Sequence, residues 1–515
     1  MFKKIVIHNV VAVLSLSLLG SFSCIAAKIE TRNYDVVVIG GGGSGATAAL
    51  AAAQSGVKVL IIEKTRQLSG STSLTKGMMG INTSLQQKRN MHLSTKEIFN
   101  KMESYTHLLF NGRLAKATVD NSAETIEWLM DNGVKLWLPE RPQQYAHDAE
   151  EPIIYHMWNG HQGMAALTKA IQDAGGDILV NTEATKIYTN DDGSMRGVRA
   201  KSVDGTTYEI AAKAVVVATG GYIGNNKMMK DNGIVGHPMG WLPNDGLGMK
   251  MAWEAGAAKH GEKVTEYHAT GIVDSNNRES KLFPRLEPLI HIPILWVDKT
   301  GQRYYNEDHV YDNALVSNAL VSIGGQGNVI FDQDTLNQFS KNKIGLTDSF
   351  AQIRGVKGGF SGPLTTLQQD MEAAVKEGIA FKGNTLEELA ENAGFLKNEF
   401  VKQVGDYNNY ISTKDDKQFY KSKNSLKYQV SKGPFYSLQV TTYNLTTIGG
   451  IKINEKMEAV TADFIPVKGL YAAGNVASGL YSDSYMTIEG LTMGFAAISG
   501  RLAGLNSAKF SKSSN

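Results

Sequence analysis

The hydrophobic pattern of the chain begins with short, unbroken apolar runs that are followed by small or polar residues. The first run, Val36–Ile39, contains only β-branched residues, which is typical of a parallel strand buried on both faces. The alanine-rich stretch Ser44–Gln54 predicts a helix, and Val57–Ile62 predicts a second strand. Strand, helix and strand in this order predict a βαβ unit and therefore an α/β fold.

Three glycines occupy the turn between the first strand and the helix. Gly40, Gly42 and Gly45 have the G-x-G-x-x-G spacing. The first permits a tight turn, the second lets a pyrophosphate approach the backbone, and the third lets the helix pack on the strand. Ser44 begins a helix whose amides and dipole would face the phosphates. Glu63, at the tip of the second strand, is placed to accept the ribose hydroxyls.

These features together predict an adenine-dinucleotide site. The alternative is a glycine turn in an ordinary α/β protein, since G-x-G-x-x-G alone is a weak signal. That alternative is disfavoured because strand, helix, strand and acid are all in register.

The pattern changes several times farther along the chain. Helical spacing occurs at Ala115–Asn132 and Gly163–Ala174, and Ala214–Gly221 predicts another buried strand that ends in glycines. Asn244–Gly256 predicts a helix with Asp245 in its first turn. Mixed short helices and loops then run from Thr265 to Thr446. We therefore predict a signal peptide at 1–27, a nucleotide-binding domain at 28–264 and 447–508, an inserted substrate domain at 265–446, and a polar tail at 509–515.

The first residues have the pattern of an export signal. Lys3 and Lys4 precede the apolar stretch Val10–Leu19, and Ala26–Ala27 provides small residues for cleavage. The apolar stretch is shorter than the roughly 20 residues of a transmembrane helix, although a retained anchor is the alternative. We expect an exported, periplasmic protein without a stable membrane span.

Composition and cysteine usage narrow the function classes. The 515 residues are 42% hydrophobic and 20% charged, and the formal net charge of +2 gives no electrostatic case for nucleic acid. The single cysteine, Cys24, lies in the predicted signal, and the bulky Phe22 before it argues against lipid anchoring. The mature chain therefore has no disulfide, no cysteine-ligated cluster and no C-x-x-C-H haem attachment. Any electrons must come from a separate carrier, and no metal site is predicted.

Further motifs appear in order along the chain: a Ser/Thr loop at 69–80, ATGG at 218–221, NDGLGM at 244–249, GQRYYNE at 301–307, IGG at 448–450 and LYAAGN at 470–475. Together with the first glycine motif they resemble the fumarate reductase/succinate dehydrogenase flavoprotein family. Its soluble periplasmic flavocytochrome-type fumarate reductases and the related 3-ketosteroid dehydrogenases are the most similar subset. The resemblance implies an α/β fold with a Rossmann-like FAD-binding domain and an inserted α+β capping domain.

The cofactor implied by the resemblance is FAD. The loop at 70–80 has no histidine for a covalent link, so noncovalent binding is expected. The helix start near Thr492 would place its positive end at the flavin ring. The FAD-binding residues expected from motif and resemblance are Gly40, Gly42, Ser44, Gly45, Glu63, Lys64, Ser71, Thr72, Ala218, Thr219, Gly220, Asp245, Gly474, Asn475, Leu491 and Thr492.

The substrate site departs from that of the fumarate reductases. Their N-E-x-x-x-R sequence provides an arginine that protonates the substrate, but here Asn306 and Glu307 lead to Tyr311. A later substrate arginine is also missing, and the corresponding segment contains Tyr485. A dicarboxylate favours bidentate guanidinium groups, so fumarate is a poor candidate substrate.

Two tyrosines match the ketosteroid dehydrogenases instead. In those enzymes one tyrosine transfers a proton and a second polarises the ketone, and Tyr311 and Tyr485 stand at these positions. The alternative is that both are packing residues, since the chain has 20 tyrosines. His268 lies in a segment that resembles the family's H-P-T sequence, and Glu287 is placed as the glutamate of the proton relay. Arg278 and Arg285 could bind one carboxylate, although solvated surface charge is the preferred interpretation.

The sequence thus predicts an exported FAD-dependent oxidoreductase that acts on CH–CH or C=C bonds. Its expected reaction is reduction of an alkene conjugated to a carboxylate or ketone, with Tyr311 as proton donor and a periplasmic cytochrome as electron source. The alternatives are a ketosteroid-like dehydrogenase that runs the reaction in reverse, and a flavin-binding electron carrier without turnover.

Overall fold

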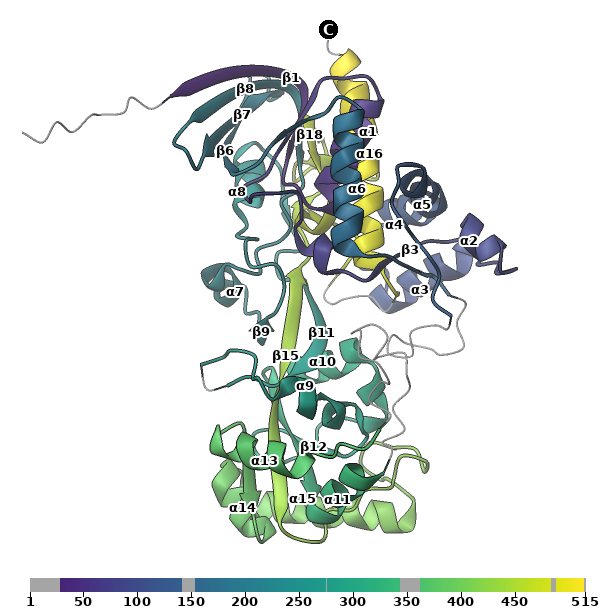
Figure 1. Ribbon diagram of the computed structural model, residues 1–515, viewed down its shortest axis with the longest axis vertical. Helices are drawn as coiled ribbons and strands as arrows, with labels where there is room; N and C mark the ends of the chain where they lie inside the picture. The colour runs from purple at the N-terminus through teal and green to yellow at the C-terminus, as the bar shows by residue number, and fades with distance from the viewer. Residues whose placement is uncertain (1–27, 141–152, 275, 343–361, 483–487, 514–515) are drawn as a thin grey trace, which may run out of the picture.

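A computed structural model describes residues 28–140, 153–274, 276–342, 362–482 and 488–513. Two lobes lie one above the other along the long axis (Figure 1). The long strand β15 (Phe435–Thr447) and its partner β11 (Thr265–Gly271) run from the lower lobe toward the upper lobe. The predicted signal peptide and Tyr485 fall outside the described residues.

An eight-stranded sheet forms the centre of the upper lobe. Its main order is β17-β18-β8-β1-β2-β5, and the antiparallel pair β6–β7 extends from β8. The central pairings β18–β8, β8–β1, β1–β2 and β2–β5 are parallel. The strands are β1 Ile29–Ile39, β2 Val59–Ile62, β5 Asp177–Leu179, β6 Thr182–Thr189, β7 Met195–Ser202, β8 Thr207–Val217, β17 Glu458–Val460 and β18 Pro466–Ala472. The parallel βαβ unit predicted from the first apolar runs is present.

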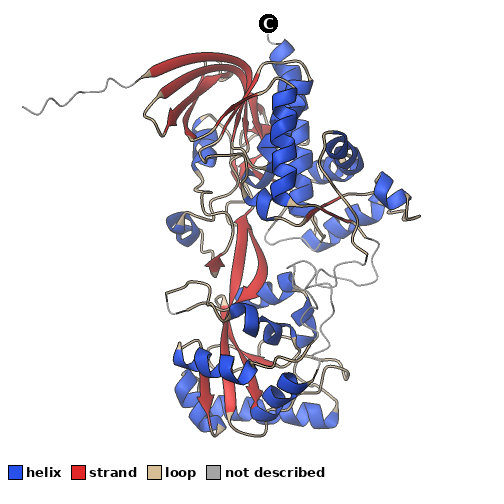
Figure 2. Cartoon of the chain, viewed as in Figure 1, coloured by secondary structure: helices blue, strands red, loops and turns tan. Residues whose placement is uncertain are grey.

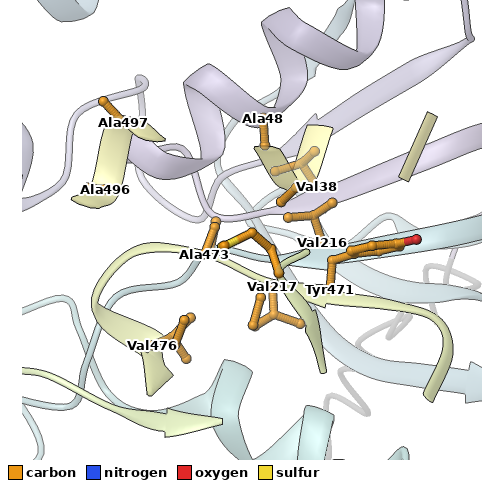
Figure 3. Packing of buried hydrophobic residues seen from close by; sticks show 14 of the residues in the cluster. Val38, Ala48, Val216, Val217, Tyr471, Ala473, Val476, Ala496 and Ala497 are labelled. Atoms are coloured by element: carbon orange, nitrogen blue, oxygen red, sulfur yellow. The ribbon is translucent and has the colours of Figure 1, made fainter. Parts of the chain in front are cut away.

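The helices α1 (Gly43–Gln54) and α16 (Leu491–Ser513) pack closely on this sheet. A Cβ atom on Gly500 would lie 2.2 Å from the Ser44 carbonyl oxygen, and one on Gly504 would lie 2.2 Å from that of Ala48. The two helices therefore approach each other more closely than side chains on those positions would allow. Figure 3 shows Ala48 of α1 beside Val38 and Val216 of the sheet, with Ala473 and Ala496 nearby.

The other elements of this part of the chain surround the sheet (Figure 2). They are η1 Ser71–Leu74, β3 Gly77–Met79, α2 Ser84–Gln87, α3 Thr95–Thr106, α4 Gly112–Asp120, α5 Ser122–Asp131, β4 Tyr155–Met157, α6 Gly160–Asp173, α7 Asn226–Asp231, α8 Leu247–Glu254, β10 Lys259–His260, β16 Gly450–Lys452, η5 Gly474–Val476 and β19 Ala477–Ser478. Among the residues described, no helix combines the length and apolar character needed to cross a bilayer.

The lower lobe is built on a six-stranded sheet, in which the long strand β15 pairs with four other strands. Its main order is β11-β15-β13-β12, with β14 and β9 also paired to β15. Two apolar cores flank the sheet. The buried residues of one core lie between Ala269 and Tyr443, and those of the other lie between Leu295 and Phe435. The remaining elements are β9 His237–Pro238, α9 Phe283–Leu286, η2 Glu287–His291, β12 Leu295–Val297, η3 Glu307–Tyr311, α10 Asn313–Ser322, β13 Gln326–Asp332, α11 Gln333–Lys341, α13 Leu367–Lys376, β14 Ala380–Gly383, α14 Leu386–Ala393 and α15 Lys397–Thr413. The predicted α/β class with an inserted α+β region is confirmed.

Two local expectations need correction. Asp245 precedes α8 rather than lying in its first turn, and its carboxylate accepts the Leu247 N–H at 2.9 Å. The helix α16 continues to Ser513, through most of the segment expected to be a polar tail. The segment remains helical because one of its faces is buried, at Ser507, Ala508 and Ser511. The buried hydroxyls of Ser507 and Ser511 are satisfied by carbonyl oxygens of the preceding turn.

A buried ion cluster holds η3 in the lower lobe. The Arg303 guanidinium donates to both oxygens of Glu307, at 2.7 and 2.6 Å, and to Asp416 at 2.8 Å. The ammonium group of Lys421 lies 3.5 Å from Glu307. Burial would raise the pKa of Asp416, but hydrogen bonds from Arg303 and from two backbone N–H groups lower it to about 2. The cluster fixes the turn that carries Tyr311.

We expect Glu307→Gln to lower the free energy of unfolding by about 3–5 kcal/mol, because Arg303 and Lys421 would be left buried with Asp416 alone. Urea unfolding measures this loss. The matched control is Asp406→Asn, which breaks the exposed pair of Asp406 with Lys402 on α15 and should cost at most about 0.5 kcal/mol. The stabilisation from Asp416 should be complete above about pH 5 and be lost as the pH falls toward 2. Equal, small effects of both variants would contradict a structural role for the cluster.

Candidate functional site

A cleft of about 920 Å³, partly open to solvent, lies at the carboxyl ends of the upper parallel strands. This edge is where ligands bind in open α/β sheets. Its described lining residues all lie outside the lower lobe. They are Ile39–Ser44, Ile62–Lys64, Gly70–Thr72, Thr75, Thr182–Ala184, Ala218–Gly220, Trp241, Asn244, Asp245, Leu247, Gly248, Asn475, Thr492, Met493 and Ala496.

The glycine turn places bare backbone in this cleft. Gly40 has a φ of +104°, and a Cβ there would lie 2.5 Å from the Ala218 carbonyl oxygen. A Cβ on Gly45 would lie 1.8 Å from the Gly40 carbonyl oxygen. In contrast, a Cβ on Gly42 would meet no protein atom closer than 4.0 Å. Gly40 therefore lets the turn pass close to the end of β8, and Gly45 lets α1 pack on the turn. In contrast, Gly42 leaves open space at the N-terminus of α1.

Glu63 directly follows the second strand, β2, and its side chain hydrogen-bonds to the glycine turn. Its carboxylate accepts the Gly41 N–H at 2.6 Å and the Thr65 N–H at 2.7 Å. A carboxylate offers about four lone-pair sites, so acceptor capacity remains for ribose hydroxyls. Beside it, the Lys64 ammonium donates to Asp245 at 2.7 Å. Burial raises the pKa of Asp245, but Lys64 and the Leu247 N–H outweigh it, so the net pKa is lowered.

The other end of the cleft lies at η5 and the start of α16. Gly474 has a φ of +71°, and a Cβ there would lie 2.4 Å from the Ser44 hydroxyl oxygen. Asn475 donates from Nδ2 to the Thr446 hydroxyl at 3.1 Å. Thr492 lines the cleft in the first turn of α16, where the helix dipole is positive.

Two buried polar atoms of the cleft have no partner among the described residues. They are Oδ1 of Asn475 and the hydroxyl of Thr219. Buried polar atoms are normally hydrogen-bonded, so these point to a polar ligand. Open backbone at Gly42, a carboxylate near the adenine end and a helix N-terminus match the parts of a dinucleotide. The residues present therefore fit FAD. Within the described ranges, no group of three or more His, Cys, Asp or Glu side chains could hold a metal ion.

Comparison with known families decides the assignment. The family profile described as FAD binding domain matches residues 35–486. The chain belongs to this family. It is therefore a member of the fumarate reductase/succinate dehydrogenase flavoproteins, as the motifs predicted.

Named relatives match nearly the whole chain. A vinyl phenol reductase of Lactiplantibacillus plantarum is 31% identical over 93% of this chain and 97% of its own length. An NADH:fumarate oxidoreductase of Klebsiella pneumoniae is 26% identical over 93% of this chain, which spans 48% of that longer protein. The open conformation of a flavocytochrome c3 fumarate reductase is similar in structure, with a TM-score of 0.66, 24% identity, and coverage of 93% of this chain and 79% of that chain. The prediction of a flavin-dependent oxidoreductase of this family is confirmed.

Most residues expected to bind FAD lie together in the cleft of this flavoprotein. Three of the expected residues are not in its lining. Gly45 and Gly474 allow close packing of the backbone next to the cleft, and Leu491 is fully buried at the start of α16. The residues of the prediction that line the cleft are Gly40, Gly42, Ser44, Glu63, Lys64, Ser71, Thr72, Ala218, Thr219, Gly220, Asp245, Asn475 and Thr492.

The expected catalytic residues are not part of this lining. Tyr311 ends η3 in the lower lobe and is 40% exposed. His268 is half-buried in β11. Glu287 is buried in η2, with its carboxylate 3.9 Å from Nε2 of His291. Tyr485 lies outside the described residues. The catalytic roles of these four residues thus remain predictions.

Two residues near the cleft were missed. Glu266 is buried in β11, and Tyr481 donates to the Thr492 hydroxyl at 3.4 Å. Glu266 stands two positions before His268 in the predicted substrate segment, and an acid within the β-prone segment TEYHATG was the available signal. The sequence gives no comparable signal for Tyr481, because its contact depends on the packing of α16.

Proposed function

We propose that this flavoprotein reduces a carbon–carbon double bond conjugated to an uncharged group, such as a ketone or an aromatic ring. The observation that carries the proposal is the near full-length similarity to a vinyl phenol reductase, at 31% identity. The name of that relative indicates an alkene conjugated to an aromatic ring and without a carboxylate. The dinucleotide cleft at the sheet edge supports the same class of chemistry.

The charge of the lower lobe supports an uncharged substrate. Tyr311 stands where the fumarate reductases carry an arginine. Arg285 is paired with Asp370 at 2.7 Å, and Arg278 is paired with Asp274 at 2.7 Å. Both arginine side chains are more than half exposed, as expected for surface charges. Arg303, the remaining arginine that the structure describes in the lower lobe, is bound to Glu307 and Asp416. None of these three described arginines is therefore left unpaired to form the bidentate clamp that a dicarboxylate favours.

When bound, FAD supplies a hydride to the substrate alkene. The residues that would hold it are the lining residues at Gly42, Glu63, Asn475 and Thr492, without a covalent bond. Tyr311 would deliver the proton to the adjacent carbon. A tyrosine, with a reference pKa of about 10, is a stronger acid than the arginine that it replaces. Tyr485 would donate a hydrogen bond to the activating group, with His268 and Glu287 at the substrate and in the proton relay.

Cell location and electron supply complete the proposal. The residues at 1–27 would direct export to the periplasm, where a separate cytochrome or other carrier would reduce the FAD. A second candidate function is ketosteroid-like dehydrogenation, the same reaction reversed. It is favoured by the tyrosine at 311 and by Asn475 in the glycine–asparagine turn.

A substrate screen tests the proposal. The FAD-loaded protein is incubated anaerobically with reduced viologen and with 4-vinylphenol, an α,β-unsaturated ketone, acrylate or fumarate. We expect viologen oxidation with the vinylphenol or the ketone at a rate at least 10-fold above that with fumarate. Desaturation of a saturated 3-ketosteroid with an artificial acceptor would favour the second function. A preference for fumarate, or no turnover with any compound, would contradict the proposal.

A further inference from the structure

Glu266 is a buried acid close to the FAD cleft that the proposed reaction does not use. It lies in β11 and is 8% exposed. None of the ion pairs among the described residues includes it. Its described polar partner is the hydroxyl of Thr492, which hydrogen-bonds to its carboxyl group. Thr492 lines the cleft, so Glu266 lies one hydrogen bond behind the cleft wall.

Tyr481 extends this arrangement into a chain of three groups. Its hydroxyl donates to Thr492 Oγ1 at 3.4 Å, and the Thr492 hydroxyl is left to donate to Glu266. Tyr481 is only 3% exposed. Burial raises the pKa of Tyr481, so it stays a neutral donor throughout the working pH range. The chain therefore ends on Glu266, which is its single group able to gain or lose a proton near neutral pH.

We propose that Glu266 is a positioning residue that acts through Thr492 and couples the uptake of one proton to the reduction of FAD in the cleft. The inference rests on the proposed function in one respect, namely that FAD is bound here and cycles between oxidised and reduced forms. It does not depend on which alkene is the substrate. Reduction brings two electrons into the cleft, and their negative charge disfavours an ionised carboxylate nearby. The proton is taken from solvent and stays on the Glu266 carboxyl group until FAD is reoxidised.

The electrostatic surroundings suit this role. Burial raises the pKa of Glu266 to about 8, and the hydrogen bond from Thr492 opposes that rise. Among the residues that the structure describes, the titratable group that faces it from outside its own strand is the phenol of Tyr481. On its own strand, Tyr267 and His268 follow it. The neighbouring residues of β15 are Thr447 and Asn444, which do not titrate.

The other elements packed on β11 add little charge near Glu266. Helix α10 carries no acidic, basic or tyrosine side chain. The turn η2 carries Glu287 and His291, which lie 3.9 Å from each other. Reduction should therefore move the pKa of Glu266 upward from about 8. Between the values for oxidised and reduced protein, reduction takes up one additional proton.

The test is the midpoint potential of bound FAD, measured by dye equilibration from pH 6 to 10 without substrate. One proton per two electrons changes the potential by about 30 mV per pH unit. Above about pH 8, the midpoint potential of the wild-type protein should fall with pH about 30 mV per pH unit more steeply than it does below pH 8. Glu266→Gln, which keeps the shape of the side chain but not its charge, should show no such break. The two proteins should agree below pH 7, and the variant should have the higher potential at pH 9.

Thr492→Val is the companion variant, because it keeps the carboxyl group and removes its hydrogen bond. Thr492 lowers the pKa of Glu266, so this variant should move the break to higher pH. Identical slopes in wild type and Glu266→Gln would overturn the proposal, as would an unmoved break in Thr492→Val if Glu266→Gln fails to fold. Absence of bound FAD from the wild-type protein would instead overturn the proposed function.

Discussion

Replacement of Tyr311 by phenylalanine should lower turnover of the preferred alkene at least about 100-fold while FAD stays bound. The phenol is the proposed proton donor, and general acid catalysis contributes roughly 10²–10⁴-fold. FAD affinity should not change, because Tyr311 lies in the lower lobe and outside the lining of the cleft. The measurement is kcat with reduced viologen, together with the flavin absorbance per protein.

The matched control for this variant is Tyr420→Phe. Tyr420 also lies in the inserted region, and its side chain is 83% exposed, so its loss of a hydroxyl should leave kcat unchanged. Wild-type turnover in Tyr311→Phe would remove Tyr311 from the mechanism. Loss of flavin together with activity would show instead that the residue supports cofactor binding.

The Gly42→Ala variant should fold normally and bind FAD at least about 100-fold more weakly. Gly42 has a φ of −75°, which alanine adopts without strain, and the new methyl would meet protein only at 4.0 Å. The methyl would instead occupy the space in which a pyrophosphate approaches the backbone. Isothermal titration of the apoprotein with FAD measures the affinity, and thermal unfolding of the apoprotein checks the fold.

Gly405→Ala provides the matched control for that variant. Gly405 lies on the exposed side of α15, with no protein atom within 4 Å of the added Cβ. Alanine in a helix interior should stabilise the protein by about 0.5–1 kcal/mol and leave FAD affinity unchanged. Wild-type FAD affinity in Gly42→Ala would contradict the placement of the pyrophosphate at this turn.

The part of the fold closest to the cofactor could be predicted because its signals are local. Val36–Ile39 is a run of β-branched residues, and its glycine-rich continuation requires conformations and contacts that few other residues allow. The strand at Ala214–Gly221 could be recognised for the same reason, although β8 begins earlier, at Thr207. Its first half alternates between buried residues and residues that are partly or fully exposed, and was not recognised as a strand.

The rest of the site depends on contacts between distant segments. Glu266 and Thr492 are 226 positions apart in the sequence, and only the packing of β11 near the start of α16 brings them together. The end of α16 was missed for a related reason. Serines and lysines after Ser507 suggest a solvated tail, but their helix packs along the upper lobe. The hydrophobic periodicity of a single segment carries no information about packing between segments that are distant in the sequence.

The residues proposed for catalysis came from motif positions, and the lining of the cleft does not include them. Glu307 shows why a motif can have two roles. It belongs to the N-E motif that leads to Tyr311, yet its own carboxylate is occupied by Arg303 and Lys421. The acidic residue of the motif thus builds the turn, and the proposed proton donor is Tyr311, four positions later.

The most direct test of the central claim is a single-turnover experiment. The FAD-loaded protein is reduced with dithionite, freed of excess reductant and mixed anaerobically with one equivalent of 4-vinylphenol. Return of the oxidised flavin spectrum together with one equivalent of the ethyl product is the predicted result. A flavin that stays reduced with 4-vinylphenol and with an α,β-unsaturated ketone, yet is oxidised by fumarate, would contradict the account.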